Sequence, residues 1–194
     1  MNWTVLEENL IDKNNKKHAG GKAREDLFNI LIEYGFSEII IKCPQEEREN
    51  ANAIKKLSYH YKIRKEWDRV LSGLRPNDNL VLQFPVINQT LLFSGVLRKV
   101  KRRGVRIYAF IHDLNYLRFS SQSKLSWKQK LRIRTEELKE LRDFDAIVVH
   151  NDAMKKRICS QLGIEDNKVI TLKLFDYLLP TGYKSNCEEI TADE

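Results

Sequence analysis

The sequence lacks the features that mark secreted, disulfide-bonded or membrane-spanning proteins. Its 194 residues include three cysteines, an odd number without C-x-x-C spacing, at positions 43, 159 and 187. This predicts reduced thiols. No apolar run approaches the roughly 20 residues that span a bilayer. The first ten residues, MNWTVLEENL, have neither the basic start nor the apolar core of a signal peptide. We therefore expect a cytoplasmic protein.

Several sequence motifs that indicate a particular reaction or ligand are also missing. There is no G-x-G-x-x-G, no P-loop and no G-x-S-x-G elbow, which argues against a serine hydrolase and gives only a weak signal for nucleotide binding. No Cys/His cluster accompanies the histidines, so we predict neither a metal site nor a cofactor. Asp143-Phe144-Asp145 has the D-x-D form that metal-dependent sugar transferases use. It precedes a predicted strand, so we interpret it as a turn.

Charge is moderately unbalanced. The chain carries 34 basic and 27 acidic side chains, for a formal charge of +7. This excess favours an anionic partner, or it serves solubility alone. A basic tract can be interpreted as solvated helix surface or as a patch facing acidic lipids. Nucleic acid is disfavoured, because Trp127 alone provides no stacking platform. The tract comprises Arg98 to Arg106 with Lys124, Lys128, Lys130, Arg132 and Arg134.

Short apolar segments alternate with helical patterns along almost the whole chain. Such alternation predicts an α/β fold with a doubly wound, mostly parallel, Rossmann-like sheet. The length and the 42% hydrophobic content fit one domain, which we place at residues 1–179, with 180–194 as a linker or tail. The expected strands are 3–6, 38–42, 80–84, 105–111, 145–150 and 168–172. The expected helices are 19–34, 46–74 (with a break near 58–61), 88–103, 131–141 and 153–162.

The segment from Val105 to Ile111 is apolar on both faces, which is typical of a central parallel strand covered by helices. His112 and Asp113 follow it directly. Ligands of such sheets bind just beyond the carboxyl ends of the strands. We therefore expect the functional site at His112–Asp113.

Other polar residues follow neighbouring strands. Gln83 precedes Pro85, and His150 precedes Asn151; Asp176 follows the last strand. Gly20–Gly21 begins a helix, where backbone N–H groups and Lys22 could receive an anion. We expect this glycine pair, His112 and His150 to meet at one edge of the sheet. The alternatives are that strand ends are polar because they meet water, that Asn151 only caps a helix, and that the glycines only allow a turn.

Five motifs occur in a fixed order: Ala19-Gly20-Gly21-Lys22-Ala23, Gln83-Phe84-Pro85, Ile111-His112-Asp113 with Leu117–Arg118, Val149-His150-Asn151 with Met154, and Phe175-Asp176-Tyr177-Leu178. The series, over about residues 19 to 179, resembles the amino-terminal half of bacterial β-1,6-galactofuranosyltransferases. It is also similar to the related glucosyltransferases of exopolysaccharide and adhesin glycosylation.

That resemblance implies one half of a GT-B hexosyltransferase, in which the amino-terminal domain holds the acceptor and a second domain holds the nucleotide sugar. The implied donor is a UDP-sugar, without a metal, and the implied acceptor is a saccharide, a lipid-linked sugar or a glycoprotein. The sequence ends where the second domain would begin, so we expect this chain to be inactive in sugar transfer on its own. Peripheral contact with the cytoplasmic face of the inner membrane and a homo-oligomer are left open.

Two classes of residue follow from position and resemblance together. His112 and Asp113 are the candidate catalytic residues, either of which could take the proton of the attacking hydroxyl, or which could act as a pair. The rival interpretations are a non-catalytic α/β interaction or activator domain that partners a separate donor-binding subunit, and a nucleotide-binding regulator. The candidate substrate-binding residues are Gly20, Gly21, Lys22, Gln83, Arg118, His150 and Asn151.

Overall fold

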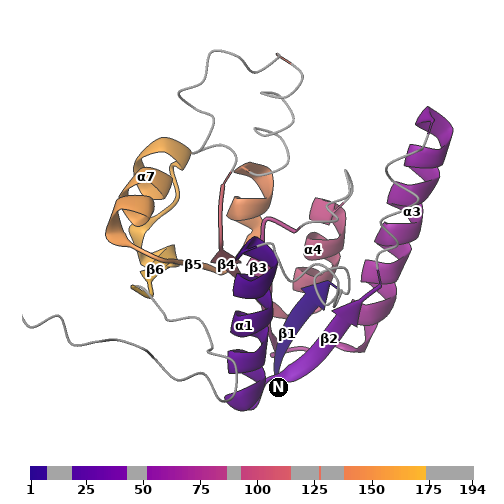
Figure 1. Cartoon of the computed structure of the whole chain (residues 1–194), viewed down its shortest axis with the longest axis horizontal. Helices are drawn as coiled ribbons and strands as arrows, with labels where there is room; N and C mark the ends of the chain where they lie inside the picture. Colours follow the sequence, from indigo (N-terminus) through magenta and orange to yellow (C-terminus); the bar gives the residue numbers. More distant parts are fainter. Residues whose placement is uncertain (8–18, 43–51, 87–92, 115–126, 128–137, 174–194) are drawn as a thin grey trace, which may run out of the picture.

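A computed structural model describes residues 1–7, 19–42, 52–86, 93–114, 127 and 138–173 (Figure 1). Each of the six strands expected from the sequence is present, with no end shifted by more than one residue. The elements are β1 (Asn2–Glu7), α1 (Ala19–Glu33), β2 (Ser37–Ile41), α3 (Ala53–Val70), the 3-10 turn η2 (Leu71–Gly73), β3 (Asn79–Phe84), α4 (Phe93–Arg102), β4 (Arg106–Ile111), β5 (Ala146–Val149), α7 (Asp152–Leu162), η3 (Asp166–Lys168) and β6 (Val169–Thr171).

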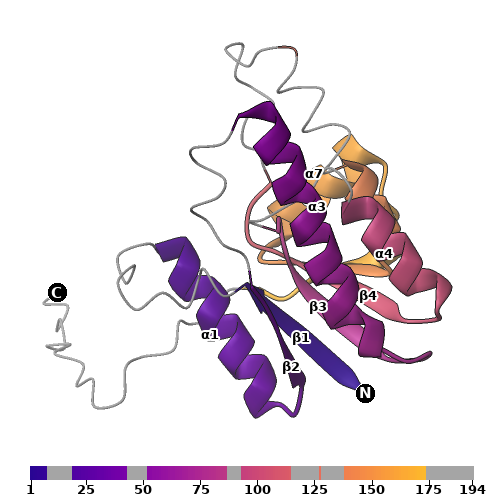
Figure 2. The same ribbon diagram turned by 90° about the vertical axis from the view of Figure 1, so that its right-hand side faces the viewer.

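The strands form a six-stranded sheet in the order β2-β1-β3-β4-β5-β6, and every neighbouring pair is parallel. Helix α1 lies on one side of β1 and β2, while α3 and α4 lie together on the other (Figures 1 and 2). The α/β prediction is therefore confirmed. Strand order reverses between β1 and β3, which makes this the topological switch point of the sheet.

The core explains why the central strands are so apolar. Leu80, Leu82 and Phe84 of β3 are buried, as are Ile107, Ala109 and Ile111 of β4. Alternate residues of a strand share one face of the sheet, and this face packs in one core with residues of α3 and α4. Aromatic rings also join α3 and α4 to each other. Trp67 of α3 meets Phe93 of α4 edge-on, with ring centroids 4.8 Å apart.

Helix ends follow local signals in the sequence. Asn151 caps α7, since its side-chain oxygen accepts the Met154 N–H at 2.8 Å. Gly163 ends α7 with a left-handed φ of 63°. The break expected near residues 58–61 is wrong, because α3 is continuous through it. Its stripe of Tyr59, Ile63 and Trp67 is buried against the core, which holds this part of the helix in register.

Helix α3 also carries apolar side chains on its outward face. Ile54, Leu57 and Tyr61 are 79%, 67% and 54% exposed. Their i, i+3, i+7 spacing places them on one face of the helix, away from the buried stripe. We call these three residues the outward row of α3.

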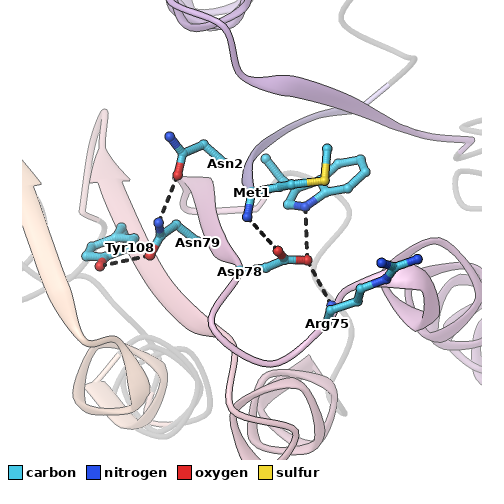
Figure 3. Close-up of polar contacts among 7 residues, drawn as sticks. Met1, Asn2, Arg75, Asp78, Asn79 and Tyr108 are labelled. Carbon is cyan, nitrogen blue, oxygen red and sulfur yellow. Dashed lines mark hydrogen bonds and ion pairs between the residues drawn. The ribbon is translucent and has the colours of Figure 1, made fainter.

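At the edge where the strands begin, Asp78 joins several elements (Figure 3). Its carboxylate is buried and accepts hydrogen bonds from the Met1 amino group at 2.7 Å, the Trp3 indole at 3.2 Å and the Arg75 N–H at 2.8 Å. These donors, the Arg75 N–H foremost, lower the pKa of Asp78. Next to it, Asn79 bonds to the side chains of Asn2 (2.8 Å) and Tyr108 (3.3 Å).

The basic end of α4 is largely neutralised within the protein. Lys99 pairs with Asp68 at 3.1 Å and Lys101 with Asp145 at 2.9 Å. Arg103 donates to the carbonyls of Leu71 and Ser72 at 2.6 and 3.0 Å. These contacts favour the solvated-surface interpretation of this part of the basic tract. Among the helices that the structure describes, none is both long and apolar enough to cross a bilayer.

The same contacts account for the D-x-D motif. Asp145 accepts the Ile107 N–H at 2.8 Å, and Lys101 also donates to the Asp143 carbonyl at 2.7 Å. Arg98 lies 3.9 Å from the Asp143 carboxylate. The motif thus ties the beginning of β5 to β4 and α4, at the opposite edge from His112, as its interpretation as a turn predicts.

Candidate functional site

At the edge where the strands end, three of the predicted site residues come together. His112 Nε2 lies 2.7 Å from Gln83 Oε1, and the rings of His112 and His150 have centroids 6.1 Å apart. Phe110 packs against both imidazoles, at 5.1 Å and 5.3 Å between centroids. The convergence expected of the two histidines is therefore present.

The parallel register produces this convergence. Phe110 of β4 pairs with Val148 of β5, so His112 and His150, each two residues further on, lie level at the same edge. The ladder between β3 and β4 also continues past the last paired residues, because the His112 N–H donates to the Phe84 carbonyl at 2.9 Å. This bond fixes the backbone of His112 beside Gln83.

Arg24 of α1 is a central residue of the site that sequence reasoning missed. Its side chain is buried, at 7% exposure, and donates to the carbonyls of Gln83 at 3.3 Å and Pro85 at 2.7 Å. Gln83 Nε2 donates in return to the Arg24 carbonyl at 2.9 Å. The sequence did contain a signal for it. Arg24 precedes the core residues Leu27 and Phe28 by three and four positions, which places it on the buried face of the helix.

Burial and a neighbouring acid act in opposite directions on Arg24. Burial lowers the pKa of its guanidinium, while the charge of Glu7 raises it. Glu7, the last residue of β1, is itself buried. Two opposite charges therefore lie at the switch point of the sheet, where each reduces the cost of burying the other.

The crevice expected at the switch point is mostly filled by protein. A small pocket remains there, with about 10 Å³ open to the centre of a water-sized sphere, which is room for about one water molecule. In the part of the chain that the structure describes, the buried indole N–H of Trp67, which lines this pocket, has no hydrogen-bond partner. The lining residues are Val5, Leu6, Glu7, Arg24, Trp67, Leu82, Gln83 and Val86.

Both imidazoles are kept neutral at physiological pH. Burial, followed by the charges of Arg24 and His150, lowers the pKa of His112 from 6.5 to about 3. Burial also lowers the pKa of His150, against the opposing effect of a hydrogen bond with the Ile111 backbone. An imidazole with so low a pKa is a weak proton acceptor at pH 7, but its unprotonated nitrogen still accepts hydrogen bonds.

Asp113 and Asn151 lie at the exposed side of this edge. Asp113 accepts the N–H of Leu114 at 2.8 Å, and its side chain is exposed. The Gln83 amide, rather than the Asp113 carboxylate, is the group within hydrogen-bond distance of His112 Nε2. Asn151 uses its side-chain oxygen to cap α7.

The glycine pair lies at the start of α1, as predicted. Gly20 and Gly21 lie within the first helical turn, and Lys22 pairs with Asp26 at 2.8 Å. The role of the glycine pair stays a prediction. Arg118 and Asp176 lie outside the described residues, as do residues 174–194, where the predicted domain boundary falls.

Comparison with known proteins agrees with this picture. The family model "Glucosyltransferase 3-like, N-terminal domain" matches residues 8–174. Over 92 residues the chain is 27% identical to Glucosyltransferase 3 of Streptococcus parasanguinis, covering 47% of this chain and 25% of that relative. The matched segment thus spans only a quarter of the curated relative. By the extent of the family match, this chain belongs to the family of glucosyltransferase 3-like amino-terminal domains.

Proposed function

We propose that this chain is the acceptor-binding domain of a nucleotide-sugar-dependent hexosyltransferase of GT-B architecture that transfers a glucosyl or galactofuranosyl group. Membership of the family supports sugar transfer in general. The observation that carries the acceptor role is the group of neutral hydrogen-bonding side chains at the strand ends, Gln83, His112 and His150. Neutral polar groups suit the hydroxyls of a saccharide better than the phosphates of a nucleotide.

Within this site we assign different roles to the two candidate catalytic residues. Asp113 is exposed, and its carboxylate is a better proton acceptor for the attacking hydroxyl than an imidazole of low pKa. As the acceptor oxygen bonds to the anomeric carbon, the bond from that carbon to the donor phosphate breaks and the nucleoside diphosphate leaves. His112, whose pKa is about 3, holds a hydroxyl by accepting a hydrogen bond. His150 and the amide of Asn151 flank the same position.

The donor is assigned to a second domain. Lys22, the described cation at the start of α1, already pairs with Asp26, and the guanidinium of Arg24 is committed to backbone carbonyls. A UDP-sugar would therefore find few unengaged charges among these residues. We propose no metal, because the D-x-D carboxylates hold β5 and α4 together at the opposite edge.

An NMR titration of the 194-residue chain tests this proposal. Methyl β-glucoside and methyl β-galactoside should shift the amide signals of Gln83, His112 and His150, and UDP-glucose should shift them weakly. The variant His112→Ala should lose the saccharide shifts, whereas Asn167→Ala, at an exposed turn position, should keep them.

Two outcomes would contradict the acceptor role. Tight UDP-glucose binding by this chain would favour the nucleotide-binding regulator. No response to any of these sugars would favour the non-catalytic interaction or activator domain.

A further inference from the structure

The orientation of the Gln83 amide is settled by its neighbours. Its Nε2 donates to the backbone carbonyl of Arg24 at 2.9 Å. A carbonyl oxygen can only accept, so the NH₂ group must face α1 and Oε1 must face the other way. The usual ambiguity between the two ends of an amide does not arise here.

This orientation decides where His112 carries its proton. Gln83 Oε1 lies 2.7 Å from His112 Nε2, and an amide oxygen can only accept a hydrogen bond. His112 Nε2 must therefore carry the N–H. A neutral imidazole has a single N–H, so Nδ1 is the unprotonated nitrogen and acts as an acceptor. Within the described part of the chain, the ring makes no other hydrogen bond.

Arg24 secures the other side of the Gln83 residue. Its guanidinium holds the carbonyls of Gln83 and Pro85, while its own carbonyl receives the Gln83 amide. Both side chains are buried, at 7% and 6% exposure, so water competes little for these bonds. Arg24 and Gln83 thus act on His112 through a continuous chain of hydrogen bonds between α1, β3 and β4.

We propose that Arg24 and Gln83 are positioning residues that fix His112 as the Nε2–H tautomer, and that His112 Nδ1 receives a hydroxyl of a neutral, hydroxyl-bearing ligand. The saccharide class of that ligand rests on the proposed function. An anion that carries no O–H or N–H group cannot bind at Nδ1, because its oxygens are acceptors and unprotonated Nδ1 is an acceptor too. Protonation of His112 would lift the restriction, but Arg24 and His150 both oppose it. Among the described residues, the acids closest to this network are Asp113, next in the chain, and Glu7, whose charge acts on Arg24.

The tautomer can be measured on the wild-type 194-residue chain before any ligand is added. Long-range ¹H–¹⁵N spectra of ¹⁵N-histidine-labelled protein distinguish a protonated from an unprotonated ring nitrogen, and His112→Gln assigns the signals. We expect Nε2 protonated and Nδ1 unprotonated at pH 7, persisting below pH 5. A proton on Nδ1, or an imidazolium at pH 7, would overturn the proposal.

A charge change at the positioning residue adds a second measurement. Gln83→Glu places a carboxylate beside His112 Nε2, so the titration midpoint of His112 should rise by roughly 1–3 pH units. The matched control is Gln161→Glu, at an exposed position of α7, and it should leave the midpoint unchanged. Equal midpoints in the two variants would show that Gln83 does not act on the ring.

The ligand class is tested with methyl β-glucoside and inorganic sulfate as probes, because sulfate carries no O–H donor at pH 7. The glucoside should move the Nδ1 signal of His112, and sulfate should not. A shift with sulfate alone would overturn the ligand assignment. Glucoside shifts elsewhere in the protein that spare His112 would overturn it too, yet leave the acceptor role of the domain standing. No change in any signal with either probe would reject the ligand class together with the proposed function. The tautomer is tested separately, by the spectra of the ligand-free protein.

Discussion

The two edges of this sheet treat charge in opposite ways. Where the strands begin, Asp78 is surrounded by N–H donors that favour its charged form, and its pKa is lowered. Where the strands end, burial and the charge of Arg24 disfavour the charged form of His112. One edge keeps a carboxylate ionised, and the other keeps an imidazole neutral.

The difference separates holding strands together from receiving a ligand. At the amino edge, the carboxylate oxygens of Asp78 bond to groups of the protein itself, from Met1, Trp3 and Arg75. At the carboxyl edge, the same kind of network ends at His112 Nδ1, which has no hydrogen-bond partner among the described residues. A polar group that its neighbours orient and leave open to a ligand is what a binding site requires. We expect the first edge to govern stability and the second to govern recognition.

The largest expected effect is on the free energy of unfolding at acid pH, where the two edges should respond differently. The unfolded chain protonates His112 near pH 6.5 and the folded chain only near pH 3, so unfolding takes up a proton between these values. The stability contribution of a neutral His112 is therefore complete above pH 6.5 and is lost as pH falls toward 3. Each unit of difference in pKa corresponds to about 1.4 kcal/mol. His150, whose pKa is also lowered, contributes with the same sign.

Urea unfolding at a series of pH values measures this loss. His112→Gln should flatten the curve between pH 6.5 and 3, the interval set by the two pKa values. The contribution of Asp78 to stability should be lost at lower pH than that of His112. A carboxyl group with a lowered pKa contributes fully above its ordinary value of 3.8 and loses this contribution only as pH falls below that value. An unchanged slope in His112→Gln would remove the contrast between the edges.

A second prediction concerns the amino edge. Asp78→Asn removes the charge and one acceptor oxygen from a carboxylate that receives three donors, so the melting temperature should fall by roughly 5 °C. The His112 tautomer should not change. Asp166→Asn, in which an exposed carboxylate loses its pairing with Lys155, should have a smaller effect. An equal fall in melting temperature in both variants would mean that Asp78 stabilises the fold no more than an exposed carboxylate does.

The smallest predicted effect is at the turn that leads into β4. Gly104 has a φ of 83°, and an added Cβ would lie 3.4 Å from Pro76 Cβ. Gly104→Ala should therefore reduce the free energy of unfolding by about 1–2 kcal/mol. Gly73→Ala is the matched control, since nothing lies within 4 Å of its added Cβ. If calorimetry finds the two variants equally stable, the backbone of this turn is not strained by a side chain.

The strands and the histidine pair could be predicted because their signals are local. A run such as Ile107 to Ile111, apolar on both faces, has few stable positions other than the middle of a covered sheet. Once the strands are parallel, His112 and His150 must emerge at the same edge. Their positions in the sequence therefore determined their proximity in space.

The role of Arg24 could not be predicted in the same way. Its partners, Gln83 and Pro85, are 59 and 61 residues away in the chain, and no periodicity encodes contacts at that separation. The neutralisation of α4 has the same origin, because Lys99 finds Asp68 across two packed helices. The break expected in α3 is wrong because Tyr59 and Ile63 pack into the core, and these tertiary contacts are not visible in the local sequence.

The outward row of α3 sets a practical condition for all the titrations described above. Ile54, Leu57 and Tyr61 expose apolar surface to solvent, and two molecules that associate through this surface would bury it. Such self-contact grows with protein concentration and would move resonances as a sugar does. Ligand additions should therefore be made at constant protein concentration, with a blank dilution series recorded beside them.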